Sequence, residues 1–593
     1  MVLRSMRKLV GLLAGLLVII FSSCDDSSTP EDVTIAEVMG DVVTQIYAEG
    51  AENDFSDKTQ DEVLEWFTEE EKKVLATKYW NFNVDQPVEV YIAQDQRQEE
   101  DPFWLNENGF QKTDQIVKNS HVTYDLWKKD FPAGLVELGI NGLDRHRYVY
   151  FVIVKPKEGE SPLSVEPVFP AQQKISVFEE GAFTYHDWDE LVITDLPSEL
   201  EGSVLLPTYR GRSREAHLIG GFRQTEFPSS DTIDHIVQTW SGDPRTSLTI
   251  GWRTSVDVDQ SELKYWKEGS TDTMTISGDA ETLEDRMLSN DRYIKRFTAD
   301  ITGLEPGTTY NYRLSTSAYD SPSYQFVTDD GSDQFTFGWF GDVHNHPNWG
   351  ELLQKVDGEN EDIRFYLQAG DLVNTGLFRD DWDRLIQYSG NVFRNKPFMA
   401  VPGNHDSQEG LPPLRFLEYL KYPHNGPYEE EYGMTYTFRY GNTEFFMMDC
   451  VTTSVEDQAE WLEEQLQASD AVFKIASFHF SAFTPHEDYD DIVGSWVPLF
   501  EKYGVDLVFT GHFHYYQRIK AHGAKLSEKG TPTYIMSVGT TMKNEDVAVS
   551  TEYEKTLYRD HLVQIVNVNG KRLELVAQDS DGNEIDRYVI DKN

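Results

Sequence analysis

Five short strings in the second half of the chain carry carboxylate, imidazole and amide side chains at spacings that suit metal binding. Each follows an apolar run, so each is expected where a strand ends. Carboxylates, imidazoles and amides are the ligands that a pair of divalent ions takes. In chain order the strings are Gly341-Asp342-Val343-His344, Gly370-Asp371, Gly403-Asn404-His405-Asp406, His479 and Gly511-His512-Phe513-His514.

Two of the strings place two ligands on the same side of the chain. Asp342 and His344 are two residues apart, as are His512 and His514. At the end of a strand, side chains two residues apart point the same way. Each pair can therefore reach one ion.

The other strings supply single ligands. Asp371 can give one oxygen to each of two ions and so bridge them, while Asn404 offers an amide oxygen and His479 an imidazole. With Asp371 shared, each of two ions, about 3.5–4 Å apart, receives four protein ligands. The pattern thus predicts a dinuclear metal centre.

Such a centre favours chemistry on phosphate esters. Two ions lower the pKa of a shared water and clamp the oxygens of a phosphoryl group during attack. His405 follows the ligand Asn404 and can donate a proton to the leaving oxygen as a general acid. We expect Asp406 to set the tautomer of His405 and to raise its basicity.

Alternating strand and helix patterns surround the strings. Helical spacing is found near 351–356 and over 455–467, and the tail at 561–590 is expected to form a hairpin or strand pair turning at Gly570 and Gly582. In α/β folds, ligand sites favour the carboxyl ends of strands. The short apolar runs expected to be strands are 335–340, 363–367, 398–401, 445–448, 473–478 and 505–509.

The composition of the chain limits the classes of molecule that it is expected to bind. The 593 residues allow three or four domains, and 102 acidic residues against 52 basic ones give a formal net charge of −50. Such a field repels polyanions, so we expect no nucleic acid polymer as a partner. The acidic surface favours solubility, with calcium or a basic partner as the alternative.

The first residues predict export. Arg4, Arg7 and Lys8 precede the 13-residue apolar run Leu9–Phe21, which suits a signal sequence better than a membrane span. Phe-Ser-Ser-Cys, ending at Cys24, resembles a bacterial lipoprotein processing site. The resemblance implies cleavage before Cys24 and its lipidation, which would anchor the exported protein to a bacterial membrane; a secretory signal cut slightly later is the alternative. Cys450 is expected to be buried.

The chain divides into five predicted ranges. Residues 1–23 are the signal peptide and 24–32 a tether; 33–225 is an α+β region, helical to about 82 and then β-rich, with no chemical signature. Strand patterns at 247–252 and 304–313 make 226–330 similar to a fibronectin-III-like all-β sandwich. Residues 331–593 form the α/β catalytic domain.

Together the five strings resemble the calcineurin-like metallophosphoesterases over roughly 335–545. The preceding sandwich, and the continuation to Arg518, resemble the purple acid phosphatase branch, although Gln517 replaces the Glu common there. The resemblance implies a β-sandwich flanked by helices in four layers, with two ions from among Fe, Zn and Mn. The first ion would take Asp342, His344, Asp371 and His514; the second would take Asp371, Asn404, His479 and His512.

One departure from the branch is informative. Purple acid phosphatases place an iron-binding Tyr three residues after the bridging Asp, where this chain has Asn374, and they usually lack a residue like His344. One ligand is lost and another gained, so we expect no purple tyrosinate band. The resemblance also suggests that His486 contacts substrate phosphate, and His346 is a second candidate for substrate contact.

We therefore expect an exported phosphohydrolase acting on phosphomonoesters, with a metal-activated hydroxide as nucleophile and His405 as acid. Hydrolysis of small diesters or nucleotides is an alternative, because both classes present the same phosphorus to the metals. An inactive surface-binding lipoprotein is a further alternative. The oligomeric state is left open by the sequence.

Overall fold

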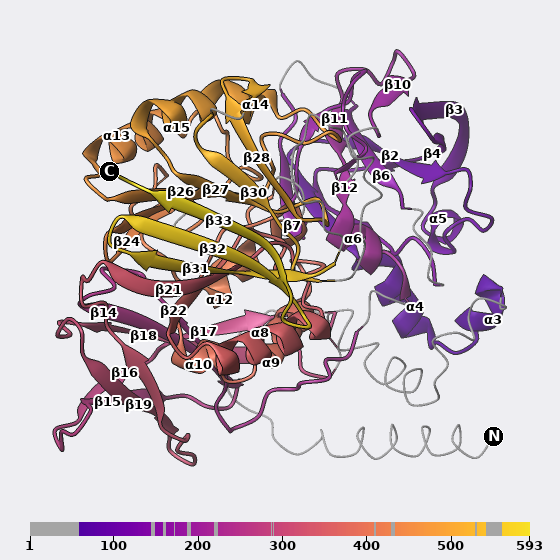
Figure 1. Ribbon diagram of the computed structural model, residues 1–593. Helices are drawn as coiled ribbons and strands as arrows, with labels where there is room; N and C mark the ends of the chain where they lie inside the picture. The colour runs from indigo at the N-terminus through magenta and orange to yellow at the C-terminus, as the bar shows by residue number, and fades with distance from the viewer. Residues whose placement is uncertain are drawn as a thin grey trace.

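The computed structural model describes residues 59–593. Gaps in that description fall at 144–148, 158–161, 171, 187–190, 219–222, 286, 289, 408–410, 429–432, 528–529 and 541–559. The predicted signal peptide, tether and Cys24 lie outside the described residues. Figure 1 shows three modules along the chain: an N-terminal module in indigo and purple, a sandwich in magenta, and a larger C-terminal module ending in yellow. Within the described residues, no helix has the length and hydrophobicity to cross a membrane.

The N-terminal module opens with two short helices, α3 (Gln60–Leu64) and α4 (Glu69–Thr77). Each starts with a threonine whose hydroxyl caps the helix while a glutamate three residues later reaches back. Strand β1 (Trp80–Val84) begins earlier than the predicted helical limit at 82. Its apolar residues alternate with Asn, a strand period rather than a helical one.

The rest of this module is mostly β, as predicted. Three sheets run in the orders β5-β1-β7, β10-β3-β4-β2-β6-β11-β8 and β12-β9, with short helices between strands. The elements are β2 (Val88–Asp95), α5 (Trp104–Glu107), β3 (Gln111–Asn119), β4 (Thr123–Phe131), β5 (Gly134–Leu138), β6 (Phe151–Pro156), β7 (Val165–Phe169), β8 (Ser176–Val177), β9 (Tyr185–His186), β10 (Ile193–Asp195), β11 (Val204–Leu206), β12 (Thr208–Tyr209) and α6 (Arg210–Glu215).

The second module is the expected all-β sandwich. Two four-stranded sheets close over Trp252, which is fully buried, stacks on Phe297 and donates its indole N–H to Ser261 of the opposite sheet. The sheets, in strand order, are β13 (Asp234–Thr239), β14 (Ser247–Ser255), β18 (Tyr293–Thr302) and β17 (Asp279–Glu284), then β16 (Met274–Ser277), β15 (Ser261–Lys267), β19 (Thr309–Thr316) and β20 (Tyr324–Val327).

The C-terminal module has two mixed sheets, and all the predicted strands are present in it. One sheet has the order β23-β22-β21-β31-β32-β33 and the other β24-β25-β26-β27-β30-β28-β29. Their strands are β21 (Gln334–Phe340), β22 (Ile363–Gln368), β23 (Phe398–Ala400), β24 (Tyr436–Tyr440), β25 (Thr443–Met447), β26 (Phe473–Ser477), β27 (Leu507–Thr510), β28 (Gln517–His522), β29 (Lys525–Leu526), β30 (Thr533–Met536), β31 (Leu562–Asn569), β32 (Arg572–Asp579) and β33 (Glu584–Asp591).

Aromatic side chains fill the space between these two sheets. Trp339 stacks on Phe509 with ring centroids 4.3 Å apart, and Phe337 meets both Phe365 and Phe445. Helices flank both sheets, which gives the four expected layers, while the tail strands β31, β32 and β33 lie at the surface (Figure 1). The helices are α8 (Pro347–Glu359), α9 (Arg379–Tyr388), α10 (Val392–Asn395), α11 (Asn404–Ser407), α12 (Leu414–Tyr419), α13 (Ala459–Ala468), α14 (Asp490–Ser495) and α15 (Val497–Tyr503).

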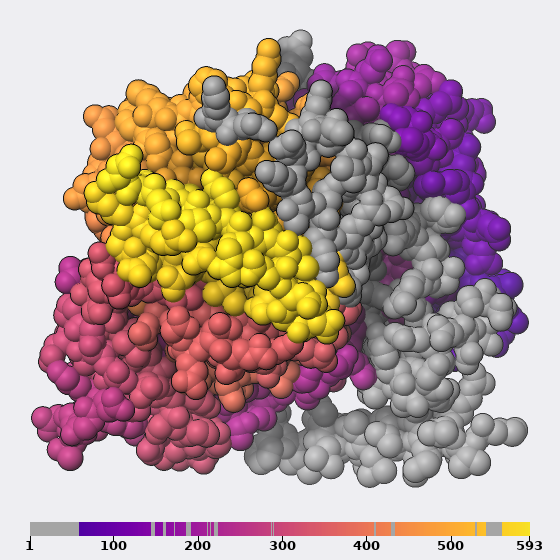
Figure 2. Space-filling view, viewed as in Figure 1, coloured from indigo at the N-terminus to yellow at the C-terminus, as the bar shows by residue number. Residues whose placement is uncertain are grey.

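The C-terminal tail corrects one prediction. It forms three antiparallel strands, not a pair, and β31 pairs with β21 at the centre of its sheet. Gly570 and Gly582 turn the chain with positive φ, as expected. In Figure 2 these strands form a yellow band across the surface of the module. The tail therefore completes the sheet that carries Asp342 instead of ending as a separate hairpin.

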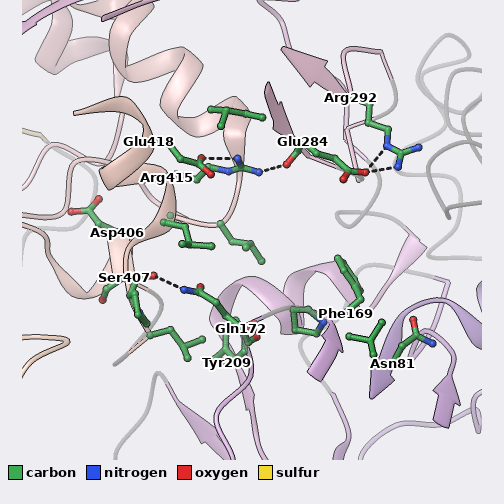
Figure 3. Close-up of a pocket in the computed structure, with 18 of the residues that line it drawn as sticks. Asn81, Phe169, Gln172, Tyr209, Glu284, Arg292, Asp406, Ser407, Arg415 and Glu418 are labelled. Carbon is green, nitrogen blue, oxygen red and sulfur yellow. Dashed lines mark hydrogen bonds and ion pairs between the residues drawn. The ribbon is translucent and has the colours of Figure 1, made fainter. Parts of the chain in front are cut away.

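Buried ion pairs join the three modules. Arg223 contacts Asp285 of the sandwich at 2.6 Å, Asp380 of α9 at 2.9 Å and Glu215 of α6 at 3.7 Å. A cavity of about 580 Å³ lies at the same junction (Figure 3). Arg415 and Glu284 on its wall are already engaged in ion pairs or hydrogen bonds. Of the candidate site residues, Asp406 lines this cavity.

Candidate metal centre

The candidate ligands gather where strands of both sheets end. Asp342 follows β21, Asp371 follows β22, Asn404 lies beyond β23, His479 follows β26 and His512 follows β27. The parallel pairings β21–β22–β23 and β26–β27 bring these ends to the same edge of the module. Residues up to 172 positions apart in the chain thus meet because the parallel topology aligns their strands.

The first cluster contains Asp342, His344, Asp371 and His514. The Nε2 atoms of His344 and His514 are 3.0 Å apart, and Nε2 of His514 lies 3.2 Å from Oδ2 of Asp342. His344 Nε2 is also 3.7 Å from Oδ2 of Asp371. These nitrogen and oxygen atoms converge on one point and could hold one ion.

The second cluster contains Asp371, Asn404, His479 and His512. The amide Oδ1 of Asn404 lies 2.9 Å from Nε2 of His479 and 3.2 Å from Nδ1 of His512. His479 Nε2 is 3.4 Å from Oδ1 of Asp371. Asp371 therefore turns one carboxylate oxygen toward each cluster, the orientation that a bridging ligand requires.

The nitrogen and oxygen atoms of the first cluster suit a bound cation better than a buried site without one. Asp342 is fully buried, yet its Oδ2 accepts no hydrogen bond from any residue that the structure describes. A buried charged oxygen that lacks a hydrogen-bond donor is costly, even where the other oxygen of the same carboxylate accepts one. The Nε2 atoms of His344 and His514 lie 3.0 Å apart beside that oxygen. A cation in the first cluster would satisfy all three atoms.

The charges of the site depend on Asp371. Burial by itself would raise the pKa of Asp371, but the imidazolium groups of His479, His405 and His344 lower it well below its usual range. The reciprocal effect raises the pKa of His479 to about 10 against the opposing effect of burial. His479 therefore holds positive charge beside the carboxylate of Asp371 when no cation is bound.

Backbone groups orient the carboxylates and imidazoles. His512 N–H donates to Oδ1 of Asp342 at 2.7 Å, and His405 N–H donates to Oδ1 of Asp371 at 2.9 Å. Nδ1 of His479 lies 2.9 Å from the carbonyl oxygen of Ala369. That acceptor holds a hydrogen on Nδ1, so Nε2, which faces Asp371, is the nitrogen that could bind a cation after losing its own proton.

The backbone is strained at the ligands. His344, Asp371 and His512 have φ values of 48°, 50° and 78°, in the left-handed region that non-glycine residues rarely adopt. The neighbouring glycines are needed for space: a Cβ at Gly511 would collide with Oδ1 of Asp342, and one at Gly403 with Oδ1 of Asp371. Gly403 and Gly511 thus each let a carboxylate lie against the backbone.

His405 lies beside the clusters. Its Nε2 is 4.0 Å from Oδ2 of Asp371, its ring packs edge-on against His344 at 4.5 Å, and its side chain is 15% exposed. Nδ1 lies 2.9 Å from the carbonyl oxygen of Asn374, which can only accept. The hydrogen therefore sits on Nδ1, and Nε2 is the nitrogen that can carry a transferable proton.

Asp406 does not have the role that the sequence predicted. Its carboxylate accepts hydrogen bonds from the backbone N–H groups of Leu372, Val373 and Gly403 rather than from the ring of His405. Burial and the charge of Asp371 raise its pKa to about 7. The side chain turns inward because three backbone donors of the ligand loops need an acceptor there. Asp406 therefore ties the loops of Asp371 and Asn404 together.

The two candidate substrate contacts, His346 and His486, lie outside the two ligand clusters. His346 caps α8 by accepting the N–H of Asn348. His486 is exposed and stacks on Phe513 with ring centroids 4.9 Å apart. Neither ring belongs to the two ligand clusters. Cys450 is buried, as expected.

Two kinds of contact with the candidate site residues were not predicted from the sequence. The carbonyls of Ala369 and Asn374, which orient His479 and His405, have no signature in residue type. Glu487 is the other: Oε2 lies 3.7 Å from Nε2 of His512, and this contact, together with the Tyr489 hydroxyl and the charge of His486, lowers the pKa of Glu487 to about 2 against the effect of burial. The sequence signal that could have indicated Glu487 is its position directly after His486, a candidate for substrate contact.

Comparisons with known proteins agree with the two structural modules. Residues 335–516 match the family model for calcineurin-like phosphoesterases, and residues 233–328 match that for the purple acid phosphatase N-terminal domain. The chain therefore contains both domains, and the resemblance inferred from its motifs is confirmed.

Individual relatives are distant. Purple acid phosphatase 18 of Arabidopsis thaliana is 26% identical over 41% of this chain and 57% of its own length. Acid phosphatase type 7 of Mus musculus is 24% identical over 49% of this chain and 71% of its own. The chain spans less than two thirds of the first curated relatives that it matches.

One solved structure has the same fold. A purple acid phosphatase from yellow lupin seeds superposes with a TM-score of 0.53 at 14% identity, covering 87% of this chain and 94% of the lupin chain. The purple acid phosphatase-like architecture of a β sandwich followed by an α/β phosphoesterase domain is therefore confirmed.

Proposed function

We propose that this protein is a metal-dependent phosphohydrolase that cleaves phosphomonoesters at a two-cation centre. The observation that carries the proposal is the orientation of Asp371, whose Oδ1 faces His479 while its Oδ2 faces His344. The phosphoesterase domain match and the purple acid phosphatase relatives support the reaction class. Likeness to that branch favours monoesters over diesters.

Asp342, His344, Asp371 and His514 would hold one cation, and Asp371, Asn404, His479 and His512 the other. When bound, such a pair acidifies water and neutralises the oxygens of a phosphoryl group. Nε2 of His405 lies at the edge of the clusters, 4.0 Å from Oδ2 of Asp371, where a proton on it could pass to the leaving oxygen. Asn374 fixes the ring of His405 through its carbonyl oxygen.

The residue types also bear on the cations. Asn374 stands where a Tyr ligand would be expected, and His344 supplies an imidazole instead. Carboxylate and imidazole ligands suit Fe, Zn or Mn. We expect the loaded protein to have no tyrosinate-to-iron absorption band in the visible region. A purple preparation would contradict this ligand set.

The decisive experiment is a panel of p-nitrophenyl monoesters and diesters assayed with the purified protein, with elemental analysis of the same sample. We expect two cations per chain and faster release from the monoester. Faster diester hydrolysis would assign the protein to phosphodiesterases. Two cations without hydrolysis of either class would favour a binding protein, and fewer than two after reconstitution would refute the centre.

We also propose that the protein is exported and anchored to a bacterial membrane through lipidated Cys24. The basic residues, the apolar run Leu9–Phe21 and the Phe-Ser-Ser-Cys string support this. Labelling with a radioactive fatty acid should mark the unaltered protein and not Cys24→Ser. Equal labelling of both would contradict lipidation at Cys24, and a mature N-terminus beyond residue 24 would indicate an ordinary secretory signal.

A further inference from the structure

His512 uses its two ring nitrogens in opposite directions. Nδ1 faces the second cluster, 3.2 Å from Oδ1 of Asn404, so Nε2 points away from it. On that far side lies the carboxylate of Glu487, with Oε2 3.7 Å from Nε2. A neutral imidazole carries one hydrogen, and its position decides which nitrogen can bind a cation. Whatever stabilises the hydrogen on Nε2 therefore leaves the Nδ1 lone pair for the cluster.

The surroundings of Glu487 place its carboxylate for this role. The hydroxyl of Tyr489 donates to Glu487 Oε2. Phe480 stacks on the Tyr489 ring at 4.9 Å and packs edge-on against the ring of His512 at 4.7 Å. The packed rings of Phe480 and Tyr489 thus position both Glu487 and His512. The Glu487 side chain is 49% exposed, so a small rotation can shorten the 3.7 Å to hydrogen-bond distance.

We propose that Glu487 is a positioning residue that holds His512 in the tautomer with hydrogen on Nε2 and thereby strengthens cation binding at the second cluster. Carboxylates that accept from the distal nitrogen of a metal-binding histidine fix the ring and make it a better ligand. We expect the effect to fall on the second cluster, because His512, the ring that Glu487 faces, belongs to that cluster.

The inference rests on the proposed two-cation centre, and its test has a readout other than turnover. Metal-free protein is titrated with Co²⁺, following visible absorption and heat. The variants are Glu487→Gln, which keeps the shape but removes the charge, and Glu487→Asp, which keeps the charge. Asp488→Asn is the matched control, since Asp488 is exposed and has no ion pair with His512.

We expect Glu487→Gln to weaken one of the two binding steps by about 10- to 100-fold and to change the other by less than about twofold. Asp488→Asn should change the affinity of neither binding step by more than about twofold. The cation affinity of Glu487→Asp should lie between that of Glu487→Gln and that of the unaltered protein. Turnover of Glu487→Gln should recover at high metal concentration, because the variant lacks affinity rather than a reacting group.

Two results would overturn the proposal. Equal weakening by Glu487→Gln and Asp488→Asn would show a general effect of negative charge near the site. Two unchanged binding steps in Glu487→Gln would show that Glu487 does not position His512. Fewer than two binding steps in the unaltered protein would instead refute the two-cation centre itself, so the two failures are distinguishable.

Discussion

At the scale of single residues, Asp371 has the widest consequences because each of its carboxylate oxygens faces a different cluster. We expect Asp371→Ala to abolish phosphate release and to lower the bound metal below two ions per chain. Elemental analysis alongside a phosphatase assay tests this. The control is Asp259→Ala, whose side chain is 95% exposed. Retention of both cations and activity by Asp371→Ala would exclude a bridging role.

His405 should behave differently from the ligands. Because its proposed role is proton donation, His405→Ala should keep both cations but lose about 10²- to 10⁴-fold in turnover of an alkyl phosphate. The loss should be much smaller with p-nitrophenyl phosphate, whose leaving group departs without a proton. Loss of a cation in this variant would instead make His405 a ligand, a reading its contact with His344 and Asp371 also allows.

The glycines beside the ligands can be tested in the same way. In Gly511→Ala the new Cβ would lie 2.1 Å from Oδ1 of Asp342, so the carboxylate must move. We expect loss of one bound cation and of most activity, measured by metal content and turnover. Gly494→Ala in α14 is the control, because a Cβ there meets nothing within 4 Å. Equal behaviour of the two variants would mean that the space at Gly511 is unimportant.

At the scale of elements, the packing between the two sheets of the C-terminal module sets where the strand ends meet. Trp339 on β21 stacks on Phe509 on β27, joining the strand of Asp342 to that of His512. Trp339→Ala should lower the free energy of unfolding by about 3–5 kcal/mol. Met274→Ala, at an exposed position on β16, should change it by less than about 0.5 kcal/mol. Urea denaturation compares them, and similar midpoints would contradict the packing argument.

At the scale of the whole molecule, buried charges join the sandwich to the phosphoesterase module. Arg253 of β14 lies 3.0 Å from Oδ1 of Asp383 on α9, and His235, Arg379 and Tyr419 face the same carboxylate. Burial opposes ionisation, but the charges of Arg379 and Arg253 hold the pKa of Asp383 far below its usual range. Removing one partner of such a buried pair costs about 3–5 kcal/mol.

The acid dependence of stability follows from that lowered pKa. A carboxyl whose pKa is lower in the folded state stabilises the fold above its unfolded pKa of about 3.9, and this contribution is lost as the pH falls toward the folded value. Arg253→Met should therefore be less stable than the unaltered protein at pH 7 and should lose less on going from pH 5 to pH 3. Urea midpoints at both values test this; an equal acid loss in the two proteins would contradict the role of Arg253.

Much of the fold could be read from local patterns. The strands around the motifs, the Trp252 sandwich and the turns at Gly570 and Gly582 follow from residue period and turn chemistry, which depend on near neighbours. The central position of β31 beside β21 could not be read in this way. The pairing of β31 with β21, more than 220 residues away, and the addition of a third tail strand are decided by packing between distant segments.

For the site, the sequence by itself determined which side chains are present and that strand ends would offer them together. The tertiary structure decided how they face one another: Asp371 divides its oxygens between two clusters, Asp406 turns to three backbone amides, and Asn374 and Glu487 become partners of His405 and His512. Residue type states what a group can donate or accept, but the partner it meets depends on where the folded backbone leaves an unsatisfied atom.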